Sequence, residues 1–190
     1  MEIMVVKFEE AEPATFPTLT VYDADDQPNE ESIVIDRPIW LRLELWIAYR
    51  WTPRQCVWTI NGCGEWSPHV SPASNLTVDV WDSESFTWDA YTPQQTALGG
   101  YYFPEVGTYR VTGTVGDNAG DVPQMVTEAY MRLKAYHDEA ETSGTPAGIA
   151  SHSLKLGDGY EESQNRNPNY FARSLHYSGS ADLLRSYRRI

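Results

Sequence analysis

The spacing of apolar and polar residues changes along the chain. Between residues 54 and 115 apolar residues recur at every second position in short runs, as expected for strands with one buried face. Between residues 121 and 141 they recur every three or four positions, as on one face of a helix. The pattern therefore predicts an α+β protein with a small antiparallel β-sheet followed by a long amphipathic helix.

Clusters of Gly, Pro, Asn and Ser divide the first stretch into five short strands. The expected strands are 55–60, 76–81, 85–91, 100–103 and 108–115. Asn61-Gly62 follows the first strand, and this dipeptide is a strong signal for a two-residue hairpin turn. Five strands of this length make a sheet that needs a cover for its second face.

A first helix is expected over residues 36–51. Asp36 is a good N-cap and Pro38 suits the first helical turn. The residues from 41 to 49 also alternate as a strand would, so a strand stays open as an alternative. The cap and the length favour the helix.

The long amphipathic helix is expected over residues 121–141. Asp121 precedes it as a cap, and Pro123 lies in its first turn. Its apolar stripe consists of Met125, Val126, Ala129, Tyr130, Leu133 and Tyr136.

Three segments follow from charge and composition. Residues 1–35 hold nine acidic residues against Lys7 alone and are broken by prolines, which predicts an extended acidic N-terminal arm. Its apolar runs at 3–8 and 19–22 are expected to form edge strands or extended contacts. Residues 36–141 form the α+β core, and residues 142–190 form a linker and a C-terminal tail.

The C-terminal tail has a charge opposite to that of the whole chain. Residues 166–190 contain five arginines and one aspartate, a net charge of +4, whereas the chain carries −13. Two short helices are expected at 168–177 and 181–189, and helices of this length are unstable alone in water. We therefore expect this extended tail to reach away from the body and to order on a partner.

The net charge also excludes several functions. A strongly acidic chain repels nucleic-acid phosphates and anionic membranes, so neither is an expected partner. No basic leader and no apolar run of membrane-spanning length is found, which predicts a protein made in the cytosol. The two cysteines, Cys56 and Cys63, are accordingly expected to be reduced.

The sequence offers no convincing site for catalysis. The four histidines are scattered without metal-ligand spacing, and Cys56 and Cys63 lack the spacing of a zinc or redox motif. Residues 23–29 superficially resemble a calcium loop but lack its glycine, and Val34 stands where a closing acid is needed. We expect no enzyme, no cofactor and no metal.

Several strings together resemble the head–tail connector (adaptor) proteins of gene transfer agents and related siphophages. The strand of residues 107–116 is followed by Asp121-Val122-Pro123 at the start of a helix. The C-terminal strings over 167–175 and 178–189 are the most distinctive part, and residues 49–66 are also similar. The resemblance covers about residues 45–190.

The resemblance implies a structural protein of the virion neck, made in the host cytoplasm. Copies would form a ring, expected to number twelve to match the portal protein, between the portal and a stopper or tail-terminator protein. DNA would only pass through the channel of the ring, and an acidic surface lets it slide. We expect a monomer in solution and ring formation on the portal.

The tail residues expected to bind the portal combine apolar anchors with arginines, which suit planar hydrogen bonding. They are Phe171, Arg173, Leu175, Leu183, Leu184, Arg185, Tyr187, Arg188 and Arg189. The acidic, proline-broken N-terminus departs from relatives that begin with Ala- and Leu-rich helices.

Two other functions stay open. One is a tail or baseplate component of the same particle. The other is a carbohydrate-binding β module, because seven Trp and twelve Tyr are available for stacking on sugars.

Overall fold

The computed structural model describes residues 2–22, 28–29, 33–97, 99–116, 122–142, 151–156, 160–165 and 172–188. It confirms the mixed α and β content, with an antiparallel sheet of six strands and four helices among these residues. Two compact units share the chain. The sheet unit holds residues 1–17 and 48–121, and the helical unit holds residues 18–47 and 122–188.

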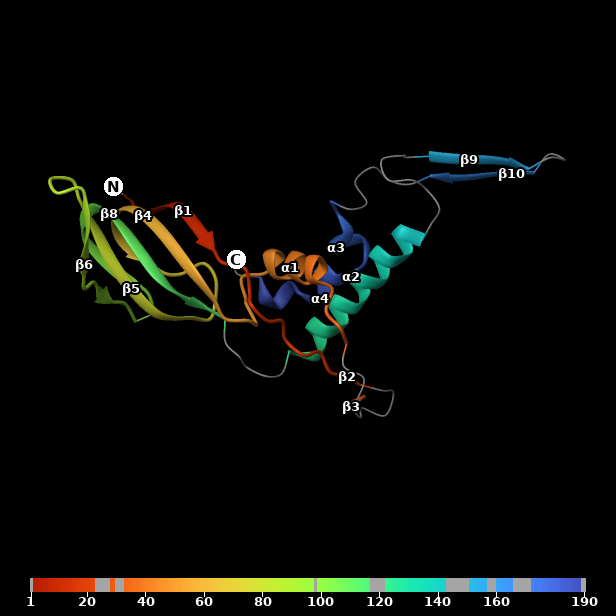
Figure 1. Ribbon diagram of the computed structural model, residues 1–190, viewed down its shortest axis with the longest axis horizontal. Helices are drawn as coiled ribbons and strands as arrows, with labels where there is room; N and C mark the ends of the chain where they lie inside the picture. Colours follow the sequence, from red (N-terminus) through yellow and green to blue (C-terminus); the bar gives the residue numbers. More distant parts are fainter. Residues whose placement is uncertain are drawn as a thin grey trace. The chain divides into compact units, whose positions relative to one another are not determined.

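The sheet unit is one antiparallel sheet in the order β1-β4-β8-β5-β6 (Figure 1). A further strand, β7, pairs with β8. Its strands are β1 (Met4–Glu10), β4 (Arg54–Trp66), β5 (Ala73–Asp82), β6 (Thr87–Tyr91), β7 (Gln94–Gln95) and β8 (Tyr101–Val115). The N-terminal run expected as an edge strand is β1, which pairs with β4 along its whole length. This part of the predicted acidic arm therefore belongs to the sheet.

The predicted turn at Asn61-Gly62 is wrong. Both residues lie inside β4, which pairs with β8 from Arg54 to Trp66. The register of this pairing shifts between Gly62 and Gly64. The glycines therefore lie at an irregularity within the strand, and the strand continues beyond them. Gly62 adopts a φ of +119° that favours glycine, and a Cβ there would lie 2.6 Å from the carbonyl oxygen of Glu2. The same long pairing merges the two strands expected at 100–103 and 108–115 into β8.

The core of the sheet unit lies on one face of the two longest strands. Alternate residues of β4, including Trp58 and Ile60, are fully buried against Tyr109 and Val111 of β8. Phe8 of β1 packs on Trp58 with ring centroids 5.5 Å apart. Pro68 and Val70, in the segment between β4 and β5, are also buried, so this segment adds to the core of the unit.

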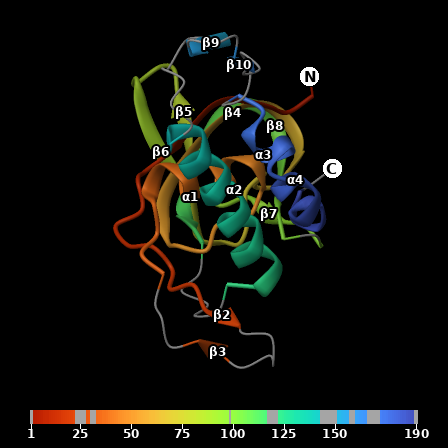
Figure 2. The ribbon, with the colours of Figure 1, turned by 90° about the vertical axis from the view of Figure 1, so that its right-hand side faces the viewer.

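The helical unit is built around two helices, α1 (Arg37–Trp46) and α2 (Gln124–Thr142) (Figure 2). The helix alternative for residues 36–51 is confirmed, although the helix ends at Trp46. Asp36 acts as the predicted N-cap, because its carboxylate accepts a hydrogen bond from the Ile39 N–H at 3.3 Å. The predicted stripe of α2 is largely confirmed, since Val126, Ala129, Tyr130 and Leu133 are buried.

Tyr130 connects the two helices. Its ring packs on Trp40 of α1 at 5.8 Å, and its hydroxyl accepts the Asp36 backbone N–H at 2.6 Å. Burial raises the pKa of this hydroxyl above its usual value, so the phenol stays neutral.

The remaining elements of the helical unit are short. They are the pair β2 (Val21–Tyr22) and β3 (Pro28–Asn29), the antiparallel pair β9 (Ser151–Leu156) and β10 (Tyr160–Asn165), α3 (Ser174–Tyr177), α4 (Ser180–Leu183) and the 3-10 turn η1 (Arg185–Tyr187). The β9–β10 pair was not predicted. None of the described helices is long and apolar enough to cross a membrane.

Candidate docking surface of the helical unit

The C-terminal helices pack on α2 of their own chain. Leu175 and Leu184 are buried, with Leu184 fully inaccessible. The Ser180 hydroxyl donates a hydrogen bond of 2.7 Å to the Ala129 carbonyl of α2 and is itself buried. The prediction that the tail leaves the body is therefore wrong for residues 172–188. Its short helices are stabilised by α2, a partner within the chain.

The arginines of this segment behave differently from its leucines. Arg173, Arg185 and Arg188 are exposed, and Leu183 and Tyr187 are half-buried. Phe171 and Arg189, which were also expected to bind a partner, lie outside the described residues. Of the expected binding residues, Leu175 and Leu184 thus lie in the interior, whereas the three described arginines lie at the surface.

Arg188 is positioned by an aromatic residue of α1. Its guanidinium lies 4.4 Å from the centroid of the Trp46 ring of α1, a cation–π arrangement. His176 of α3 meets the same ring edge-on at 4.9 Å. The end of α1 therefore orients two residues of the C-terminal segment.

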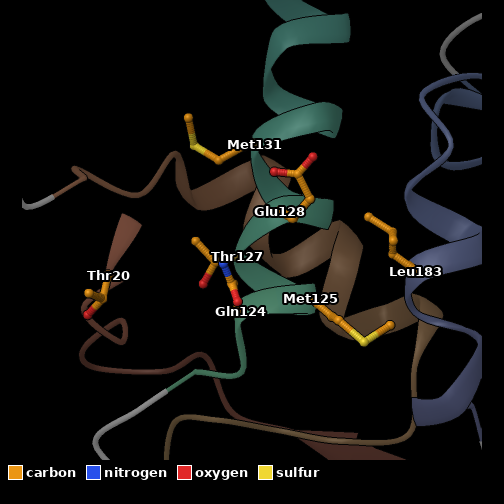
Figure 3. Close-up of a pocket in the computed structure, with 7 residues that line it drawn as sticks. All are labelled: Thr20, Gln124, Met125, Thr127, Glu128, Met131 and Leu183. Carbon is orange, nitrogen blue, oxygen red and sulfur yellow. The ribbon is translucent and has the colours of Figure 1, made fainter. Parts of the chain in front are cut away.

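A shallow pocket of about 270 Å³ opens beside the first half of α2 (Figure 3). It is lined by Thr20, Gln124, Met125, Thr127, Glu128, Met131 and Leu183. Met125 and Met131 expose 49% and 38% of their surface, so both are accessible to a partner. The hydrophobic pattern identified Met125 but missed Met131.

The charge in the wall of the pocket is balanced. Glu128 pairs with Arg132 one helical turn later at 2.7 Å. Leu183 brings the wall to the C-terminal helices, and the exposed Arg185 follows it by two residues. The wall thus combines thioether and aliphatic groups with the carboxylate of Glu128, which is paired with Arg132.

Nothing in this arrangement points to acid–base or metal chemistry. Across the part of the chain that the structure describes, no group of three or more His, Cys, Asp or Glu side chains is placed to hold a metal ion. Comparison of the sequence with protein-family models and with curated proteins finds no match.

Proposed function

We propose that this protein is a structural, non-enzymatic head–tail adaptor of a tailed-phage-like particle. Copies form a ring, of twelve to match the portal, that joins the portal to the stopper or tail terminator around the DNA channel. The observation that carries the proposal is the role of the C-terminal string over residues 178–189, the most distinctive part of the resemblance to adaptors.

Several described residues of that string have a physical task in the fold. Gly179 adopts a φ of +76°, which favours glycine, and Ser180 next to it bonds to α2. Leu184 fills the interior, and Arg185 and Arg188 remain outside. One side of the string therefore packs on the helical unit, and its basic side stays exposed. This supports a docking role for the segment.

The charge distribution supports the same role. A chain with a net charge of −13 presents arginines at its C-terminal helices, so a partner with carboxylates or free carbonyls would be recognised there. Many weak copies of one contact produce strong attachment when they act together on a ring-shaped partner.

The test compares two charge reversals in exposed residues, Arg185→Glu and Lys7→Glu. Binding to the purified portal of the same particle is measured by surface plasmon resonance. Arg185→Glu should weaken binding by roughly tenfold or more, because like charges across an interface cost several kcal/mol. Lys7→Glu, in β1 of the sheet unit, should change it less than about twofold. Equal effects of both variants would refute the docking surface.

Electron microscopy of particles carrying an epitope-labelled chain locates the protein independently. Label at the neck is the expected result. Label at the distal end of the tail would replace the adaptor with the baseplate alternative.

A further inference from the structure

The sheet unit has a pocket of its own, between the start of β5 and the turn that leads from β7 into β8. Its volume is about 320 Å³, near the lower end of the roughly 300–1,000 Å³ of sites that hold small molecules. The pocket is lined by Ala73, Ser74, Asn75, Leu76, Gln95, Gly99, Gly100 and Tyr101. It therefore has room for one small ligand.

One wall of the pocket is formed by an irregularity of β5. The register of its pairing with β8 shifts between Ser74 and Thr77, so the two residues between them lie outside the regular ladder. One of them, Asn75, has a φ of +53°, which asparagine tolerates better than most residues. Strand irregularities such as β-bulges are common next to binding sites, where they re-aim a side chain. Here the irregularity places the exposed Asn75 in the wall of the pocket.

The other wall is held by hydrogen bonds. The Thr96 N–H donates to the Gly100 carbonyl at 2.9 Å, and the Gly100 N–H donates to the Thr96 hydroxyl at 3.1 Å. Tyr101 is half-buried, its ring meets Phe103 edge-on at 6.4 Å, and its hydroxyl donates to the Leu76 carbonyl at 3.4 Å. The last contact joins the two walls. The pocket is therefore formed before a ligand arrives, which lowers the entropy cost of binding.

The lining of the pocket is polar but includes no charged side chain. An ionic ligand would find no opposite charge there, so the lining favours a neutral ligand. The carboxamides of Asn75 and Gln95 and the hydroxyl of Ser74 each donate and accept hydrogen bonds. The hydroxyls of a sugar also do both. Tyr101 and Leu76 add the smaller apolar area that the C–H face of a sugar ring requires.

The tryptophans of the sheet unit are less suited to a sugar than this pocket. Trp81 and Trp88 face each other across β5 and β6, with their ring planes 61° apart. The Arg110 guanidinium lies 4.7 Å from the centroid of the Trp88 ring. Two rings at this angle, one of them under an arginine, do not form a flat stacking platform.

We infer that the pocket binds a neutral carbohydrate, and that Asn75 and Gln95 recognise its hydroxyls. The inference goes beyond the adaptor role and does not depend on it, because the pocket and the arginines of the C-terminal helices belong to different units. A small site with neutral hydrogen bonds binds one sugar ring weakly, with an expected Kd of about 1 mM.

The test is an NMR titration of the isotope-labelled, purified full chain with glucose, galactose, mannose and N-acetylglucosamine. At least one sugar should shift the side-chain amide signals of Asn75 and Gln95 in a saturable way. Glucuronate, the anionic counterpart of glucose, should bind more weakly than the best neutral sugar. The inference fails if none of the four sugars produces such a shift, if the indole signals of Trp81 and Trp88 shift instead, or if glucuronate binds most tightly.

Gln95→Ala and Gln94→Ala form a matched pair of variants. Both glutamines are exposed in β7, but only Gln95 lines the pocket. Gln95→Ala should raise the Kd for the sugar about tenfold because it removes hydrogen bonds to the ligand, and Gln94→Ala should change it less than about twofold. The melting temperature should stay the same in both. Equal effects of the two variants on binding would overturn the inference.

Asn75→Gly tests the first wall without straining the backbone. Glycine adopts a positive φ readily, so the fold is kept while the carboxamide is lost, and the Kd should again rise about tenfold. Unchanged sugar binding in this variant would contradict the assigned role of Asn75.

The portal-binding measurement separates the two proposals. A chain that binds the portal but none of the sugars would refute the carbohydrate pocket and leave the adaptor role. A chain that binds a sugar through Gln95 but does not bind the portal would refute only the adaptor role.

Discussion

The sheet unit and the helical unit bury polar groups in different ways. In the sheet unit, Glu10 of β1 binds two buried arginines at once, Arg50 at 2.6 Å and Arg54 at 3.1 Å. In the helical unit, α1 buries the carboxylate of Glu44, and neutral hydrogen bonds connect neighbouring elements, as between Ser180 and Ala129. The sheet unit therefore ties two arginines to one carboxylate, whereas the contact between α4 and α2 includes a single neutral hydrogen bond.

The difference follows from the lengths of the elements. Strands of up to 15 residues pair along their whole length, and few further polar contacts are needed to fix them. The helices α3 and α4 have four residues each and cannot persist without α2. Short elements need a specific bond at each junction, and α1 and α4 have theirs at Tyr130 and Ser180.

The largest expected effect concerns the thiols of β4. Burial, with the nearby Glu10 carboxylate adding to it, raises the pKa of Cys56 from 9.0 to about 12. At pH 8 its thiolate is then roughly a thousandfold scarcer than that of an ordinary cysteine. Alkylation by iodoacetamide, followed by mass spectrometry, should modify Cys63 first and Cys56 only when the sheet unit opens.

The same shift has a consequence for stability. The folded state holds the Cys56 proton more tightly than the unfolded state, so this contribution is complete below pH 9 and is lost as the pH rises toward 12. Equal alkylation rates at Cys56 and Cys63 under native conditions would contradict a closed sheet core. Both cysteines are thiols in the structure, as the sequence predicted.

The next largest effect is expected on the stability of the sheet unit when its charge network is broken. Glu10→Ala removes a carboxylate that binds two nearly inaccessible guanidinium groups and should destabilise the sheet unit by about 3–5 kcal/mol. Five of the seven tryptophans lie in this unit, so denaturant unfolding followed by fluorescence reports on it.

Glu9→Ala is the matched control. Glu9 pairs with Lys7 on the surface, and its loss should cost less than about 1 kcal/mol. A similar loss in the two variants would mean that the network contributes no more than a surface ion pair.

A third substitution tests the interior of the helical unit. Leu184→Ala removes a fully buried side chain and should cost about 2–5 kcal/mol. The effect should appear as faster amide exchange in α2 and the C-terminal helices, with the strands of the sheet unit unchanged. Leu183→Ala, at a half-buried neighbour, should cost less than half as much.

The smallest expected effect concerns the neutral hydrogen bond between Ser180 and Ala129, and it compares this bond with the charged contacts of the sheet unit. Ser180→Ala removes the bond to the Ala129 carbonyl and should cost about 1–3 kcal/mol, measured by thermal unfolding at 222 nm. Ser186→Ala, at an exposed position nearby, should leave the midpoint unchanged. A loss for Ser180→Ala as large as that for Glu10→Ala would remove the distinction between the units.

Local signals in the sequence succeeded where the local structure is self-sufficient. The cap at Asp36 and the stripe of α2 were predicted because each is set by residues within a few turns. The hairpin turn predicted at Asn61-Gly62 was wrong because the structure there is not set by local residues. Pairing with β8, some fifty residues later, decides the course of β4. A turn propensity is weak against a strand partner of such length.

The candidate site was only half predictable. The basic, exposed arginines follow from composition, but the burial of Leu175 and Leu184 depends on α2. The short C-terminal helices were expected to need a partner, and in the structure that partner is α2 of the same chain. The predicted stripe of α2 did not include Met131, which lines the pocket with Leu183. The contact between Trp46 and Arg188 joins residues far apart in the sequence, so no local pattern predicts it.

The insertion of the sheet unit between α1 and α2 sets a delay during synthesis. Roughly 80 residues separate the end of α1 from the start of α2, and ribosomes add about 5–20 residues per second. For several seconds Trp40 and Leu43, both buried in the finished protein, emerge with no helix to pack against. The nascent chain is then a ready substrate for chaperones, and its yield in cells depends on how long that interval lasts.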